Sequence, residues 1–168
     1  MANINLNNKP TRTSGNLPNI GTTAKNFSLV GKELNEVTLD DFKGERIIMN
    51  IFPAIDTGVC SSSVRNFNAQ AANLSNTKIL CISRDLPFAQ NRFCGAEGIE
   101  NVVTLSDFIS GKFGKDYELT ILDGPFIHLL SRCVIVLDEE HKVLYTEQVA
   151  DIGSEPNYMA ALEVLKRP

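Results

Sequence analysis

The sequence is poor in the residues that build several common kinds of functional site. Its 168 residues include no tryptophan, two histidines and four cysteines. His128 and His141 lie far apart, and the chain has no C-x-x-C pair, so we expect no metal site. Four scattered cysteines are also too few for the disulfide framework of a small secreted protein. We therefore expect free thiols that are either buried or redox-active.

The chain also lacks the charge and hydropathy patterns of nucleic-acid-binding and membrane proteins. Its formal net charge is −4, which offers no basic surface to a phosphate backbone or an anionic membrane. No apolar run approaches the roughly 20 residues that a membrane-spanning helix needs. Residues 1–6 have neither the basic start nor the apolar middle of a signal peptide. We expect a cytoplasmic protein with no nucleic-acid or membrane partner.

The remaining composition and periodicity predict one α/β domain over residues 1–168. Hydrophobic residues make up 43% of the chain and charged residues 21%, as in an ordinary globular protein. Residues 47–52 are apolar on both faces, which is typical of a central strand, and residues 77–83 indicate a second buried strand. Between them a helical stripe follows Cys60, so strand, helix and strand form a parallel crossover unit.

The other expected elements complete a thioredoxin-like fold, a mixed central sheet flanked by helices. Alternating residues in 3–13 indicate an N-terminal β-hairpin, which we assign to an extension over residues 1–15. We expect small strands at 27–30 and 37–39, a helix from 87 to 94, a strand at 102–106, a helix at 110–117, a hairpin of 133–137 with 142–146, and a closing helix at 158–166.

Residues 50–60 carry the most informative pattern. A buried strand breaks at Pro53, and Thr57-Gly58-Val59-Cys60 then has the spacing of a thioredoxin-type C-x-x-C with threonine in the first place. A site without the first sulfur cannot exchange disulfides locally. It can still hold one thiolate at a helix N-terminus, where the helix dipole stabilises the anion. Cys60 is therefore a candidate nucleophile.

These residues resemble a known family. Pro53-x-x-x-Thr57-x-x-Cys60 matches the active-site signature of the peroxiredoxins, and residues 85–90 and 92–98 resemble the bacterial thiol peroxidase branch, an atypical two-cysteine class. The resemblance covers essentially the whole chain. It implies an antioxidant enzyme that reduces hydrogen peroxide and alkyl hydroperoxides, with some preference for the latter, and uses no metal, haem or flavin.

The resemblance also implies a role for each site residue. Cys60 would attack the peroxide and become a sulfenic acid, and Arg132 would donate to both sulfur and peroxide. Thr57 would donate a hydrogen bond to the thiolate or the peroxide, and Pro53 would pack over the sulfur and limit water. Cys94 would resolve the sulfenic acid in an intramolecular Cys60–Cys94 disulfide. Thioredoxin would then reduce that disulfide, and the protein would be a homodimer.

Other interpretations remain open at this point. Cys81 and Cys133 fall within apolar strands and are expected to be structural. Arg84 and Arg92 are expected to be solvated or paired with acids such as Asp85. The whole protein could instead be a redox sensor that switches a partner through the same disulfide, or a binding protein with vestigial cysteines.

Overall fold

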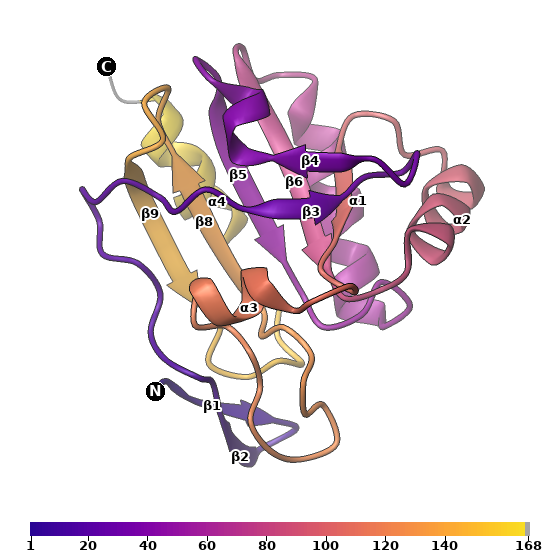
Figure 1. Cartoon of the computed structure of the whole chain (residues 1–168), viewed down its shortest axis with the longest axis vertical. Helices are drawn as coiled ribbons and strands as arrows, with labels where there is room; N and C mark the ends of the chain where they lie inside the picture. The colour runs from indigo at the N-terminus through magenta and orange to yellow at the C-terminus, as the bar shows by residue number, and fades with distance from the viewer. Residues whose placement is uncertain (167–168) are drawn as a thin grey trace.

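The computed structural model, which describes residues 1–166, confirms the predicted thioredoxin-like α/β fold. A seven-stranded mixed sheet has the order β4-β3-β7-β6-β5-β8-β9 (Figure 1). Its strands are β3 (Ser28–Val30), β4 (Glu36–Thr38), β5 (Arg46–Ile51), β6 (Thr77–Ser83), β7 (Val103–Ser106), β8 (Cys133–Leu137) and β9 (Val143–Gln148).

Four α-helices accompany the sheet in the described residues: α1 (Gly58–Ala71), α2 (Pro87–Glu97), α3 (Lys112–Asp116) and α4 (Tyr158–Glu163). Two are shorter than the sequence predicts. α3 starts only after Gly111, whose φ of 65° is left-handed and therefore non-helical. The closing helix changes to a 3₁₀ turn at Val164–Lys166, and a second 3₁₀ turn covers Leu39–Phe42. No helix of residues 1–166 is long and apolar enough to cross a membrane.

The sheet separates two apolar layers, because successive side chains of a strand point to opposite faces. Along β5, Ile47, Met49 and Ile51 enter the layer that also contains Phe113 of α3. Ile48 enters the opposite layer, which is covered by α1 and α4. Figure 1 shows α3 in front of the sheet and α4 behind it. Burial on both faces explains why the central strands are mainly apolar.

Strand register brings two distant segments to one edge of the sheet. β5 and β6 are parallel, whereas β8 runs antiparallel to β5, with Ile51 opposite Cys133. The end of β5 therefore lies beside the start of β8. As a result, the loop that leads to Cys60 and the residue before β8, Arg132, meet at the same edge.

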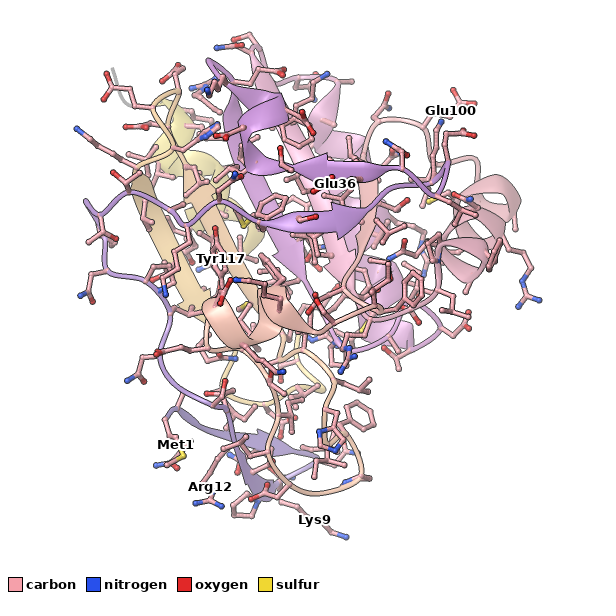
Figure 2. The ribbon with its side chains drawn as sticks, viewed as in Figure 1. Met1, Lys9, Arg12, Glu36, Glu100 and Tyr117 are labelled. Atoms are coloured by element: carbon pink, nitrogen blue, oxygen red, sulfur yellow. The ribbon has the colours of Figure 1, made fainter. Side chains whose placement is uncertain are left out.

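The predicted N-terminal hairpin is present as a separate two-stranded sheet of β1 (Asn3–Leu6) and β2 (Lys9–Arg12). Asn7 and Asn8 form its turn with left-handed φ angles of 51° and 64°, which asparagine tolerates well. Figure 1 shows the hairpin below the main sheet, and Figure 2 shows Lys9 and Arg12 at this end of the molecule.

Candidate active site

Cys60 lies in the first turn of α1, shortly after the end of β5. The strand ends at Ile51, and the buried Pro53 follows; proline has no N–H with which to continue a ladder. Thr57 then caps α1 with an extended backbone, φ −82° and ψ 144°. The side chain of Cys60 is fully buried. The unpaired N–H groups and the positive end of the helix dipole favour a negative charge on this sulfur.

Arg132 contacts Cys60 from the start of β8. The residue is 2% exposed, and its Nη2 donates to the Cys60 Sγ atom at 3.1 Å. Nε donates to the carbonyl oxygen of Ile152 at 2.7 Å. Nη1 is buried and has no hydrogen-bond partner among residues 1–166. A permanent positive charge is therefore fixed beside the sulfur, with one donor group left for a ligand.

Thr57 and Pro53 complete the loop around Cys60. The Thr57 hydroxyl donates to the carbonyl oxygen of Ala54 at 3.0 Å. A hydroxyl has one proton to donate, so in this arrangement Thr57 closes the loop and does not donate to the sulfur. Donation to the sulfur is one of the two roles that the sequence suggests for Thr57. Pro53 is buried in the same loop.

Cys94 lies in α2 and packs against the same apolar cluster as Cys60. All four cysteines are free, and Cys94 is the one that is not fully buried. Burial raises the pKa of the Cys94 thiol, whereas the charge of Lys32 lowers it. α2 ends at Gly98, whose N–H donates to the Cys94 carbonyl in a left-handed cap. Cys94 therefore lies in the last turn of α2, next to a glycine-capped helix end.

Cys81 and Cys133 have the surroundings of unreactive thiols. Both are fully buried. Burial raises the pKa of Cys81 to about 12, and burial also raises the pKa of Cys133. Both thiols therefore stay protonated and carry little thiolate character at neutral pH.

Arg84 differs from its expected role. Among residues 1–166 its guanidinium pairs with no carboxylate and donates instead to two backbone carbonyl oxygens, at 3.0 Å to His128 and 3.5 Å to Phe108. It thereby joins two surface loops. Arg92 is exposed, as a solvated side chain would be.

The sequence analysis missed a polar network centred on Asp85, just after β6. Its Oδ2 atom accepts from the Ile55 N–H at 2.7 Å and from the Ser83 hydroxyl at 2.6 Å. The Gln90 side chain in turn donates to the Ser83 oxygen at 3.1 Å, one helical turn before Cys94. Burial raises the pKa of the Asp85 carboxyl. The network connects the loop before α1 to α2, although no local pattern in the sequence shows which backbone Asp85 would meet.

Tyr158 of α4 is a second site neighbour that the sequence analysis missed. Its ring packs edge-on against Phe67 of α1, with centroids 5.2 Å apart, and its hydroxyl donates to Glu155. Burial, followed by the charge of Glu155, raises the pKa of Tyr158, and Arg132 and Cys60 are close enough to contribute. Tyr158 therefore adds an aromatic wall near the sulfur.

The site thus combines a buried thiol at a helix start with a fixed guanidinium, on a thioredoxin-like sheet. The profile of the Redoxin family matches residues 19–162. The chain superposes on a peroxiredoxin-like protein from Aquifex aeolicus with a TM-score of 0.92 and 32% identity, over 99% of this chain and 96% of that one. The fold and the site together define the class, a redoxin.

A further relative identifies the branch. The chain is 52% identical to a thiol peroxidase from Corynebacterium glutamicum over 165 residues, which cover 98% of this chain and 99% of the relative. The fold of a thiol peroxidase from Chromobacterium violaceum also matches, with a TM-score of 0.90 over 98% of this chain and 95% of that one, at 20% identity. The chain therefore belongs to the thiol peroxidases, a branch of the peroxiredoxin enzymes.

Proposed function

We propose that this enzyme reduces hydrogen peroxide and alkyl hydroperoxides through Cys60, in antioxidant defence. The observation that carries the proposal is the 3.1 Å contact between Arg132 Nη2 and the Cys60 Sγ atom, with both groups buried. A buried guanidinium beside a helix-start thiol favours the thiolate, which is the form that attacks peroxides. The unpaired Nη1 donor of Arg132 supplies a second contact for a peroxide oxygen.

In the first step the Cys60 sulfur attacks one oxygen of the peroxide. An S–O bond forms and the O–O bond breaks. The sulfur is oxidised by two electrons to a sulfenic acid, and the leaving oxygen takes a proton to become water or an alcohol. Arg132 stabilises the negative charge that moves from the sulfur to the leaving oxygen. Pro53 limits access of water, and Thr57 can reach the peroxide once its hydroxyl rotates away from Ala54.

In the second step Cys94 resolves the sulfenic acid within the same chain. The Cys94 thiolate attacks the Cys60 sulfur, an S–S bond forms, and the hydroxide that leaves takes a proton to become water. A disulfide needs Cα atoms about 4–7 Å apart, so two cysteines on separate helices require local unwinding. The shared apolar cluster of the two cysteines and the glycine cap of α2 support this step.

Thioredoxin is the proposed reductant of the Cys60–Cys94 disulfide. A surface groove of about 790 Å³ runs beside Cys94 and includes Lys32, Asn91 and Glu100. Figure 2 shows Glu100 at the upper right of the molecule, near the turn between β3 and β4. The groove gives a partner direct access to the resolving sulfur, which supports recycling by another protein. We also propose that the enzyme acts in the cytoplasm, because four scattered cysteines do not form the disulfide framework of a secreted protein.

We also propose that the enzyme is a homodimer. Exposed apolar side chains flank the loops that Arg84 joins, namely Leu86, Phe88, Ile109 and Ile127. Large apolar side chains gathered near one another on a surface are typical of an interface, and a second copy of the chain would cover them.

The test is peroxide consumption coupled to thioredoxin, thioredoxin reductase and NADPH, with wild type compared with Cys60→Ser. We expect multiple turnovers in wild type and none in the variant. One oxidation event without turnover would favour the redox-sensor alternative. A wild-type rate no faster than that of free cysteine would favour a binding protein with vestigial thiols.

A further inference from the structure

The N-terminal hairpin is the part of the fold to which the proposed chemistry assigns no role. Within it, Asn5 of β1 stands opposite Pro10 of β2, and proline has no N–H to donate across the pair. The N–H and C=O groups of Asn5 therefore point to the other side of β1. There they meet residues 150–152, the segment that follows β9.

Backbone and side-chain contacts dock β1 on this segment. Asn5 N donates to the carbonyl oxygen of Ala150, and Ile152 N donates to the carbonyl oxygen of Asn5, both at 2.8 Å. Ile4, Ile121 and Ile152 form a small buried cluster. The hairpin thus determines the position of Ile152 through both its backbone and its side chain.

Asp151 adds a third connection. Its carboxylate accepts from the N–H groups of Asn7 at 3.3 Å and Asn8 at 3.1 Å in the hairpin turn, and from Gly153 at 2.8 Å. The N–H of Asn8 makes the largest contribution to lowering the pKa of Asp151. The ionised carboxylate therefore clamps the hairpin turn to the segment that contains Ile152.

The same segment contacts the active-site arginine. The carbonyl oxygen of Ile152 accepts from Arg132 Nε at 2.7 Å, and Arg132 Nη2 donates to the Cys60 sulfur at 3.1 Å. A guanidinium is planar and rigid, so fixing Nε also fixes the directions of its two terminal nitrogens. We propose that the N-terminal hairpin is a positioning element, which holds the Ile152 carbonyl and thereby orients Arg132 toward Cys60. The inference rests on the proposed attack of Cys60 on peroxide.

The test compares two buried truncations by rapid-mixing measurement of Cys60 oxidation in the full chain. Ile4→Ala removes the hairpin side chain that packs on Ile152. Leu39→Ala is the matched control, since Leu39 and Ile4 are both 2% exposed. Leu39 packs in the layer that contains Phe113, whereas Cys60 lies in the layer on the other face of the sheet. We expect Ile4→Ala to slow the peroxide reaction about tenfold, the size expected when a hydrogen bond to a charged group loses its geometry. The control should remain within about twofold of wild type.

A double-mutant cycle separates positioning from general loosening. In an Arg132→Ala background, Ile4→Ala should cause no further loss, because the group that the hairpin positions is gone. Asp151→Asn provides a second variant that keeps side-chain shape and should slow the reaction about threefold, since a neutral amide accepts more weakly than a carboxylate. NMR of the Arg132 Nε–H should show faster exchange with water in the Ile4→Ala and Asp151→Asn variants than in wild type.

The outcomes are distinct. A wild-type rate for Ile4→Ala with unchanged Nε–H exchange would overturn the positioning role while leaving the proposed function intact. A tenfold loss that persists in the Arg132→Ala background would also overturn it, because the hairpin would then act by another route. A wild-type Cys60 no faster than free cysteine would overturn the proposed function itself, whereas the Nε–H measurement would still report on the hairpin.

Discussion

Replacement of Arg132 by lysine tests the geometry of the site, because it keeps the charge and removes the planar fork. Arg132 donates through Nη2 to Cys60 and through Nε to Ile152, and its Nη1 is unpaired among the described residues. A single ammonium cannot serve all three directions. If it stays at the sulfur, the Ile152 carbonyl loses a charged donor, which costs about 1.5–3 kcal/mol.

The effect on rate follows from the donor that a peroxide would lose. Removing one donor aimed at developing charge slows a reaction by about 10²–10³-fold. We therefore expect Arg132→Lys to lower the second-order rate constant of Cys60 oxidation by at least about 100-fold, or about 2.7 kcal/mol. Alkylation of Cys60 by iodoacetamide at pH 7 should change much less, because a positive charge still stabilises the thiolate.

The assay is rapid mixing of reduced protein with peroxide, with circular dichroism to verify folding. Arg12→Lys is the matched control: Arg12 pairs with Asp123 at the surface, where their side chains are 53% and 45% exposed, and Figure 2 shows it at the hairpin end of the molecule. The control should match wild type. A folded Arg132→Lys variant within about threefold of the wild-type rate would refute the two-pronged role of this guanidinium.

Three further predictions concern the thiols. Cys81→Ser and Cys133→Ser should keep most peroxidase turnover, because both thiols are buried and protonated; a loss comparable to that of Cys60→Ser in a folded variant would identify another nucleophile. Cys94→Ser should consume one equivalent of peroxide and stop at the sulfenic acid. Oxidised wild type should run as a monomer on a non-reducing denaturing gel, and a disulfide-linked dimer would place the resolving thiol on a second chain. Burial raises the pKa of Cys94 and the charge of Lys32 lowers it, so disulfide formation should accelerate as pH rises from 6 to 9. Lys32→Ala should slow disulfide formation at neutral pH but not at high pH. A pH-independent rate in stopped-flow measurements would contradict thiolate attack by Cys94.

The sequence alone determined the fold class and the candidate nucleophile, because both depend on local patterns. The mainly apolar stretches at 47–52 and 79–82 require burial on both faces and so predict central strands. Pro53, Thr57 and Cys60 are close in sequence, so their spacing is sufficient to place a thiol at a helix start. The resemblance to the peroxiredoxins rests on such spacings.

Tertiary structure decided which groups surround that thiol. Arg132 reaches Cys60 because Ile51 pairs with Cys133 across antiparallel strands, a register that depends on the whole sheet. Asp85 meets the backbone of Ile55 for a similar reason, since the ends of parallel β5 and β6 lie together.

The same limit applies to the hairpin and to the resolving helix. The Asn7-Asn8 turn could be predicted from the sequence, but the docking of β1 on residues 150–152 joins the two ends of the chain. Likewise, the apolar cluster that Cys94 shares with Cys60 exists only once α1 and α2 have packed. Contacts between residues far apart in the chain depend on the packing of all the elements between them, so local patterns predict the elements and the folded structure decides which side chains meet.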